Sequence, residues 1–347
     1  MTEKELVLRR MMNQRIAGGG AGSPGELVGW MGCIQSQDFG QAKWAIGVRG
    51  AAVSAAVVDA AFDDGRILRT HVLRPTWHFV LPSDIRWMLR LTAPRIRQFC
   101  QTYYKKLGLD AEVFRRSRKV LAKTLNGGRQ LTRVELGEAF TRAKINTDDI
   151  RMNFLLMDAE LEGLICSGPR KGRQFSYALL EERAPAGLVL EPDEAVAELA
   201  ARYFRSRGPA TVADFAWWSG LTVAQAKRGW EMVKGGLEDG GGGGGAVAPP
   251  PVLLLPAFDE YMVAYKDRGH ALPGEYAKKS SYGLKPVVVV DGRVAGVWRR
   301  EMGKDGVELE VRSFGRLGKK DLAAVKKEAR RYADFEGRKL AVVLPED

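Results

Sequence analysis

The chain has 347 residues, 45% of them hydrophobic, and a formal net charge of +12. This length exceeds one small core, so we expect two to four packed units. No apolar run is long enough for a transmembrane helix, for which about eighteen residues are needed. The charged segment 1–15 lacks the apolar centre of a signal peptide, so we expect a cytoplasmic protein.

Cysteine and histidine are scarce. Cys33, Cys100 and Cys166 are dispersed in apolar surroundings, which predicts buried thiols rather than disulfides. The chain has three histidines and no Cys-x-x-Cys pair, which argues against a zinc site. The run Gly18–Gly20 lacks the Lys-Ser/Thr of a phosphate-binding loop. We therefore expect neither a metal ion nor a cofactor.

From the N-terminus, helices are predicted at about 3–16 and 24–32. The second begins with an N-cap hydroxyl on Ser23, a proline at the first helical position and Glu26 at the third. The same reciprocal pairing recurs at Thr132 with Glu135, Thr211 with Asp214, and Thr222 with Gln225. These pairs predict three further helix starts.

Gln35 and Gln37 follow the second helix, separated by Ser36 and followed directly by Asp38. Each carboxamide offers an acceptor and two donors, so a pair can orient a water molecule and hydrogen-bond to a sugar or phosphate. If this stretch is extended, both side chains point the same way. The alternative is a polar surface turn. Asp38 either adds negative potential or caps the helix that follows.

A cationic band covers residues 66–129, where fifteen Lys and Arg face only three Asp and Glu. It overlaps a β-rich segment at 67–81, predicted to be the enlarged wing of the first unit. A solvated helix face usually mixes both charge signs, whereas a basic band with stackable rings is typical of nucleic-acid binding. The interleaved aromatic residues are Trp77, Phe79, Trp87, Phe99, Tyr103 and Tyr104.

A helix, a turn, a second helix and a basic glycine-rich hairpin are predicted between residues 132 and 179. This order describes a winged helix, whose second helix normally lies in a DNA groove while the hairpin touches phosphates. The hairpin tip carries Arg170, Lys171 and Arg173 as candidate phosphate contacts. The second helix shows one apolar stripe of Ile150, Phe154, Met157, Leu161 and Leu164.

The remaining chain predicts a third helix pair and a β-rich end. Two helices meet at residues 218–221, followed by a low-complexity loop that contains Gly240–Gly245. Strands are expected at 287–290, 293–298, 307–311 and 340–344, with a tight primed turn at 291–292 and a helix at 319–335. The predicted fold class is α+β, with winged-helix units at 1–105, 106–190 and 191–248 and a small β-barrel-like domain at 249–347.

Five motifs in order resemble the AlkZ/YcaQ-type winged-helix DNA glycosylases: residues 35–38, 73–80, 163–168, 254–261 and 290–293. The resemblance spans nearly the whole chain. It implies a C-shaped arrangement of tandem winged helices plus a β-barrel that grips duplex DNA in its concave face. It also implies excision of bulky alkylated purines, including interstrand crosslinks.

In that family, catalysis is attributed to a glutamine, an apolar residue, and then glutamine or aspartate. Gln35 and Gln37 match the glutamine-glutamine variant, and Ser36 departs from the usual aliphatic middle residue. A cationic N7- or N3-alkylated purine is already a good leaving group, so the enzyme needs mainly to orient water and stabilise the sugar cation. Without an obvious catalytic lysine, the expected activity is monofunctional.

His71, Arg74, Trp77 and His78 lie in the predicted first wing and are candidate DNA contacts. For the two histidines, the alternative is packing against the helices. Asp259 and Tyr261 are expected to fix a domain junction. The expected partner is double-stranded DNA carrying alkylated bases, bound by a monomer. The alternative function is a non-catalytic winged-helix transcriptional regulator.

Overall fold

The computed structural model describes residues 1–16, 22–50, 53–148, 150–184, 187–237, 250–272, 274, 284–304 and 306–343. Its fold is mixed α+β. The helices are α1 (Glu3–Asn13), α2 (Pro24–Met31), α3 (Phe39–Gly47), α4 (Ala55–Asp63), α5 (Ile85–Lys106), α6 (Ala111–Leu125), α7 (Arg133–Arg142), α8 (Arg151–Leu161), α9 (Leu180–Arg183), α10 (Pro192–Arg207), α11 (Val212–Ser219), α12 (Val223–Val233), α13 (Glu260–Val263) and α15 (Lys319–Glu336). The strands are β1 (Ile34–Gln35), β2 (Leu68–His71), β3 (Trp77–Val80), β4 (Leu131–Thr132), β5 (Ile165–Ser167), β6 (Ser176–Leu179), β7 (Val252–Leu255), β8 (Val287–Val290), β9 (Arg293–Met302), β10 (Gly306–Ser313) and β11 (Lys339–Val343).

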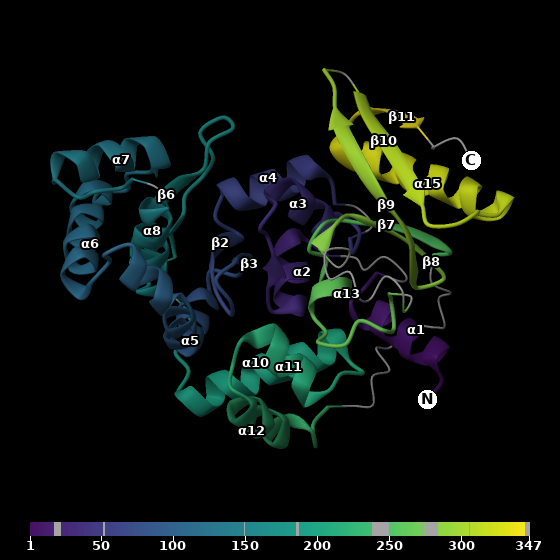
Figure 1. Ribbon diagram of the computed structural model, residues 1–347, viewed down its shortest axis with the longest axis horizontal. Helices are drawn as coiled ribbons and strands as arrows, with labels where there is room; N and C mark the ends of the chain where they lie inside the picture. The colour runs from purple at the N-terminus through teal and green to yellow at the C-terminus, as the bar shows by residue number, and fades with distance from the viewer. Residues whose placement is uncertain are drawn as a thin grey trace.

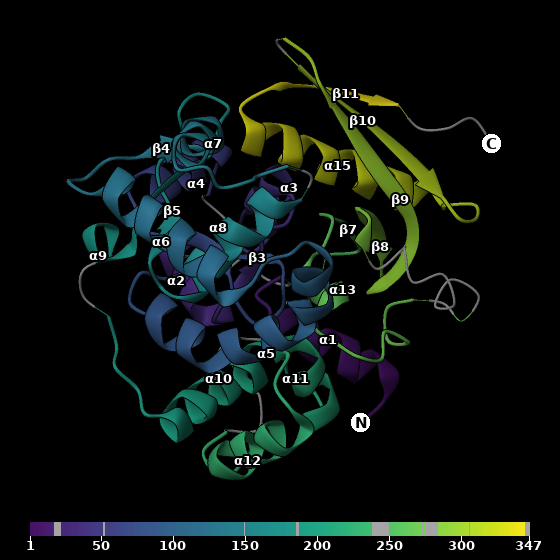
Figure 2. The same ribbon diagram turned by 60° about the vertical axis from the view of Figure 1, so that its left-hand side comes forward.

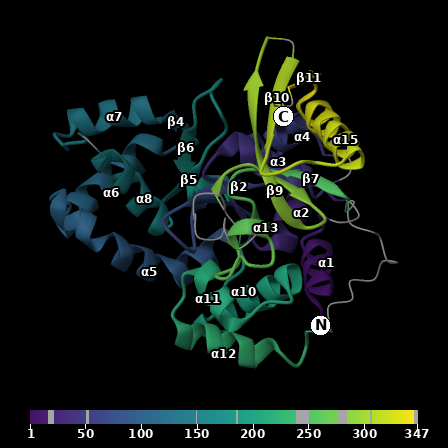
Figure 3. The same cartoon turned by 45° about the vertical axis from the view of Figure 1, so that its right-hand side comes forward.

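The elements form lobes around a central part made of α2–α4 and the sheet of β1–β3 (Figure 1). One lobe holds α6, α7 and α8, a second holds α10–α12, and the C-terminal sheet with α15 lies away from both. Figure 2 brings α5, α6 and α8 to the front. Figure 3 shows α1 and α15 along the opposite side. None of the helices in the described ranges is long and apolar enough to cross a bilayer.

The four helix starts predicted from capping pairs are confirmed. In each, the hydroxyl of Ser23, Thr132, Thr211 or Thr222 accepts a backbone N–H three residues on, and the reciprocal bond is also made. These reciprocal bonds satisfy N–H groups that a helix start otherwise leaves unpaired. Each pair joins residues only three positions apart, so its formation does not depend on the tertiary fold.

The first unit contains a small antiparallel sheet in the order β1-β3-β2. Gln35 pairs with His78, and Thr70 lies opposite His78 on the other side. Because directly paired residues point to the same face of a sheet, these three side chains share one face. Arg69, His71 and Trp77 belong to the other face.

In chain order, α7 and α8 of the second unit follow β4 and precede the antiparallel pair β5–β6. In the sheet, β6 lies between β4 and β5. The core of this unit includes Leu121, Leu136, Phe140 and Leu155. The predicted apolar stripe of α8 is only partly right, since Ile150 is 38% exposed. Burial extends around most of this helix because α5, α6 and β2 all pack against it.

In the third unit, α11 and α12 meet at Gly220, which has a left-handed φ of 70°. A Cβ at this position would lie 2.3 Å from the carbonyl oxygen of Leu73, so glycine is required both by conformation and by space. This approach docks the helix pair on the loop between β2 and β3. The predicted Gly240–Gly245 loop lies outside the described residues.

The C-terminal sheet has the order β11-β10-β9-β8-β7. Its predicted tight turn is confirmed, since Asp291 and Gly292 both have positive φ, as a type I′ turn requires. Its pairings describe an open sheet rather than a closed barrel. Helix α15 packs against both edge strands, β7 and β11.

One hydrophobic core joins the N-terminal helices to this C-terminal sheet. Trp44 of α3 donates from Nε1 to the Leu254 carbonyl at 2.6 Å and packs edge-on against Tyr332 of α15. Arg49 forms a buried two-pronged ion pair with Asp259, at 2.8 and 2.9 Å. Asp259 therefore fixes the junction as expected. The Tyr261 hydroxyl donates to the Gly292 carbonyl within the same C-terminal unit.

Candidate active site

Gln35 ends β1 and is almost completely buried. Its side-chain Oε1 accepts a hydrogen bond from Arg74 Nη2 at 3.2 Å, and its backbone N–H donates to Glu260 Oε1 at 3.0 Å. A guanidinium can only donate, so Arg74 fixes which end of the carboxamide is the oxygen. The amide nitrogen of Gln35 makes no hydrogen bond within the described part of the chain and remains available as a donor.

Gln37 lies beyond the end of the strand and is exposed. Its Oε1 accepts from the backbone N–H of Trp77 at 3.3 Å, while the Ser36 N–H donates to the Trp77 carbonyl at 2.7 Å. The two carboxamides are therefore both anchored to the β2–β3 hairpin. They differ in burial, since the strand ends at Gln35 and the expected alternation does not continue to Gln37.

Arg69 of β2 clamps the backbone of the motif. It donates to the Ser36 carbonyl from Nε and Nη2 at 3.1 and 3.0 Å. Its guanidinium also lies over the rings of Trp77 and Phe175, 4.2 and 4.7 Å from their centroids. Burial lowers the pKa of Arg69 to about 10, against the opposing effect of nearby acidic groups.

Glu260 supports the motif from behind. Its carboxylate accepts hydrogen bonds from Arg207 at 2.6 and 3.0 Å and from Trp218 Nε1 at 2.9 Å, and all three side chains are fully buried. Burial acts to raise the pKa of Glu260, but the charge and hydrogen bonds of Arg207, with the N–H of Gln35, outweigh it and lower the pKa. This buried pair ties the end of β1 to α10 and α13.

Asp38 caps the helix that follows the motif, which was one of its two predicted roles. Its Oδ1 accepts from the Gln41 N–H at 3.0 Å at the start of α3. The side chain is exposed, so its negative charge also faces solvent beside Gln37. A Cβ at Gly40 would lie 2.5 Å from Arg300 Nη2, which brings strand β9 close to this helix start.

The two histidines of the predicted wing have different surroundings. His71 is held through Nδ1 and its backbone N–H by the buried Glu160 carboxylate of α8, and its ring lies 4.5 Å from Trp77. His78 is fully buried, which corrects its assignment as a DNA contact in favour of the packed alternative. Burial, with Arg74 nearby, lowers the pKa of His78 to about 3, so its ring is neutral.

Comparison with known proteins identifies the family. The family model described as DNA glycosylase AlkZ-like matches residues 28–335, which is most of the chain. The chain belongs to the AlkZ-like DNA glycosylase family. One relative, the interstrand DNA cross-link repair glycosylase of Streptomyces sahachiroi, is 26% identical over 362 residues, which cover 96% of each chain.

A solved structure agrees with this assignment. Streptomyces sahachiroi DNA glycosylase AlkZ superposes with a TM-score of 0.80 at 25% identity, covering 99% of this chain and 100% of that one. The mixed α+β fold is thus that of an AlkZ-like protein, and the chain is a DNA glycosylase. Binding of DNA follows from this activity.

The basic residues of the second-unit hairpin have unequal freedom in this glycosylase. Arg170 is tied to α4 by ion pairs with Asp59 at 3.1 Å and Asp63 at 3.5 Å. Lys171 pairs with Glu135 at 3.2 Å and is half exposed. Arg173 is exposed and makes no ion pair within the described ranges. Arg173 is therefore the residue most open to a phosphate.

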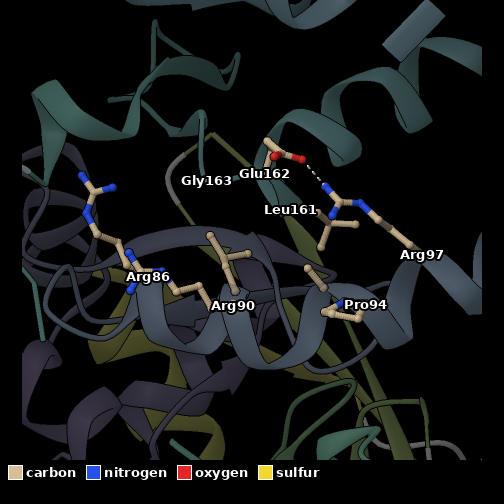
Figure 4. Close-up of a pocket in the computed structure, with 9 residues that line it drawn as sticks. Arg86, Arg90, Pro94, Arg97, Leu161, Glu162 and Gly163 are labelled. Atoms are coloured by element: carbon tan, nitrogen blue, oxygen red, sulfur yellow. Dashed lines mark hydrogen bonds and ion pairs between the residues drawn. The ribbon is translucent and has the colours of Figure 1, made fainter. Parts of the chain in front are cut away.

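A separate cavity of about 280 Å³ lies between α5 and the end of α8 (Figure 4). Arg86, Arg90 and Arg97 line it, and Arg97 pairs with Glu162 at 2.6 Å. It contains none of the predicted site residues. Across the described chain, no cluster of three His, Cys, Asp or Glu side chains is arranged to hold a metal ion.

Residue pattern alone did not identify Arg69, Glu160 or Glu260 as parts of the site. Glu260 lies within the motif at 254–261, and Glu160 lies three residues before the start of the one at 163–168, so both were near the residues used for the resemblance. Their role depends on contacts with residues 225 and 89 positions away. Each has acidic neighbours in the sequence, Asp158 and Glu162 beside Glu160 and Asp259 beside Glu260, so no local pattern distinguished these two carboxylates.

Proposed function

We propose that this glycosylase hydrolyses the N-glycosidic bond of cationic alkylated purines, using a water molecule positioned by Gln35 and Gln37. The substrates are bulky N7 and N3 adducts, including interstrand crosslinks. The observation that carries the proposal is the anchoring of two carboxamides to one hairpin, by Arg74 and by the Trp77 N–H. The printed name of the Streptomyces relative supports the extension to crosslinks.

The chemistry follows from the properties of the amide group. Each carbonyl oxygen has a second lone pair, so it can accept a hydrogen bond from water while keeping its protein partner. Its dipole also favours the positive charge that develops on the sugar. A neutral amide supplies no strong acid or base, so unmodified bases, which leave poorly, are spared. No metal or cofactor takes part in the proposed reaction.

We propose that the protein acts as a monomer. It binds duplex DNA across tandem winged-helix units, which form a C-shaped arrangement. For the second unit, the winged-helix assignment is supported by the order of its elements along the chain: strand β4, helices α7 and α8, and then the antiparallel pair β5–β6. His71, Arg74 and Trp77 are assigned to contact DNA beside the lesion. Arg170, Lys171 and Arg173 are assigned to phosphates, with Arg173 the freest of the three.

The test uses a duplex with a single N7-methylguanine. Incubation with the protein followed by hot alkali should break the strand only at the lesion, because the product is an abasic site. Omitting the alkali should leave the strand intact, as expected without a catalytic lysine. Release of the base no faster than the spontaneous rate, with binding retained, would contradict the proposed substrate class of cationic alkylated purines. A second duplex carrying a defined N7–N7 crosslink tests the crosslink assignment through the appearance of separated strands.

A further inference from the structure

Helix α5 carries charge of only one sign. None of its 22 residues is Asp or Glu, and six are basic: Arg86, Arg90, Arg95, Arg97, Lys105 and Lys106. Lys105 and Lys106 are exposed and make no ion pair within the described part of the chain. A helix with this charge pattern attracts a polyanion, and DNA is the polyanion that an AlkZ-like glycosylase binds.

The second half of α5 also exposes two aromatic rings. Phe99 is 70% exposed and Tyr103 is 49% exposed. Residues four apart lie on one face of a helix, about 6 Å apart along its axis. The Tyr103 ring stacks on Phe154 of α8, with centroids 5.6 Å apart and planes inclined by 27°. One ring of the exposed pair is therefore held in a fixed orientation.

A basic residue stands at each end of this aromatic pair. The four residues follow one another at intervals of four, four and three, which keeps them on one face of the helix. All four are exposed, and we call them the α5 stripe: Arg95, Phe99, Tyr103 and Lys106.

One end of the α5 stripe is linked by contacts to the candidate active site. Arg95 Nε donates to the Gly220 carbonyl at 3.4 Å. A Cβ at Gly220 would lie 2.3 Å from the Leu73 carbonyl oxygen, and the next residue, Arg74, donates to Gln35. In Figure 1 and Figure 2, α5 lies between the lobe of α6–α8 and the lobe of α10–α12. The stripe therefore runs from the margin of the site towards the second unit.

Aromatic rings on a basic surface favour unpaired nucleotides over a paired duplex. In a duplex the faces of the bases are covered by their neighbours, and inserting a side chain between them costs unstacking energy. An unpaired base exposes its face and can stack on a ring whatever its sequence. Cations on either side of the rings then match the phosphates that flank the stacked bases.

We propose that the α5 stripe binds unpaired nucleotides beside the lesion. Their bases stack on Phe99 and Tyr103, and Arg95 and Lys106 contact their phosphates. This inference rests on the DNA binding of the proposed function and adds to it a preference for DNA that is single-stranded next to the damaged duplex. It does not depend on the chemistry assigned to the two glutamines.

The test measures the affinity for undamaged DNA by fluorescence anisotropy, so it needs no excision. One duplex ends in a fork with two unpaired arms of about six nucleotides each, within the usual size of a single-stranded binding site. A second fork has abasic nucleotides in both arms, which keep the phosphates but offer no base to stack. Wild type should bind the fork with bases about fivefold or more tightly than the abasic fork. Equal affinities for the two forks would overturn the proposal.

Substitutions assign the preference to α5. Phe99→Ala and Tyr103→Ala should each reduce the preference for bases, and the double variant should abolish it, whereas Phe99→Tyr keeps a ring and should retain it. Lys106→Ala should weaken binding to both forks alike, because both carry the phosphates. As a matched control, Val189→Ala shortens an apolar side chain that is 73% exposed before α10, and it should bind both forks as wild type does. A preference that persists in the double variant would overturn the assignment to α5.

A second copy of this chain is the other occupant that an exposed aromatic pair would suit. In that case wild type would sediment as a dimer at micromolar concentration and Phe99→Ala as a monomer, which would overturn the proposal. Circular dichroism reports which variants are folded, and Phe99→Ala alone decides if Tyr103→Ala is unfolded. Failure to release N7-methylguanine, with the preference for bases intact, would refute the proposed substrate and leave this inference standing.

Discussion

Acidification should destabilise this protein through two buried neutral histidines. Burial lowers the pKa of both His78 and His270 to about 3, whereas an unfolded histidine titrates near 6.5. Between these values the unfolded chain binds protons that the folded chain does not, so the free energy of unfolding falls as pH falls. Between pH 7 and 5 each histidine should cost about 2 kcal/mol, or about 4 kcal/mol together.

Urea denaturation at pH 7, 6 and 5 measures this loss. Other buried groups also titrate, and Asp158 and Glu328, whose pKa burial raises, act in the opposite direction. The difference between wild type and His270→Phe isolates one histidine, because a phenyl ring can pack edge-on against Tyr261 as the imidazole does. The variant should lose about 2 kcal/mol less than wild type between pH 7 and 5. Equal losses in the two proteins would refute the reasoning.

Three further predictions concern residues around the site. Glu260→Gln leaves Arg207 buried without a countercharge and should lower the free energy of urea unfolding by about 3–5 kcal/mol; a loss under about 1 kcal/mol contradicts this. Arg173→Ala should reduce the salt dependence of DNA binding by about one phosphate contact, and Arg170→Ala, already ion-paired to α4, should reduce it less; equal slopes by anisotropy would argue against the difference. Ser36→Ala removes a buried hydroxyl that has no partner in the described chain and should change stability by no more than about 1 kcal/mol; a larger loss in urea would reveal an interaction of that hydroxyl.

Local sequence patterns predicted the local structure well. The helix start at Ser23 and the turn at Asp291 each depend on residues within three positions, and both are as expected. Pattern alone does not identify α5, because Pro94 lies inside it and a proline normally ends a helix. The exposure of Ile150 was also missed, since periodicity identifies a stripe but not which neighbours cover it.

Of the candidate site, the sequence identified the two glutamines but not the residues that support them. Gln35 and Gln37 were identified because two carboxamides at the end of an apolar segment have no role in a core. The sequence left DNA contact and burial as alternatives for His78, because it does not show which face of a short strand is covered. Arg69 and Glu160 were missed, because their partners Ser36 and His71 are distant in the sequence and only the tertiary fold brings them into contact.

The role of the two carboxamides is tested most directly by single-turnover release of N7-methylguanine, with DNA binding measured on the same duplex. Gln35→Ala and Gln37→Ala should each lower the release rate about 100-fold or more, since each removes a group that positions water and stabilises charge. Binding should stay close to wild type in Gln37→Ala, whose side chain is assigned to chemistry rather than to phosphate. Release at the wild-type rate in both folded variants would contradict catalysis by these glutamines.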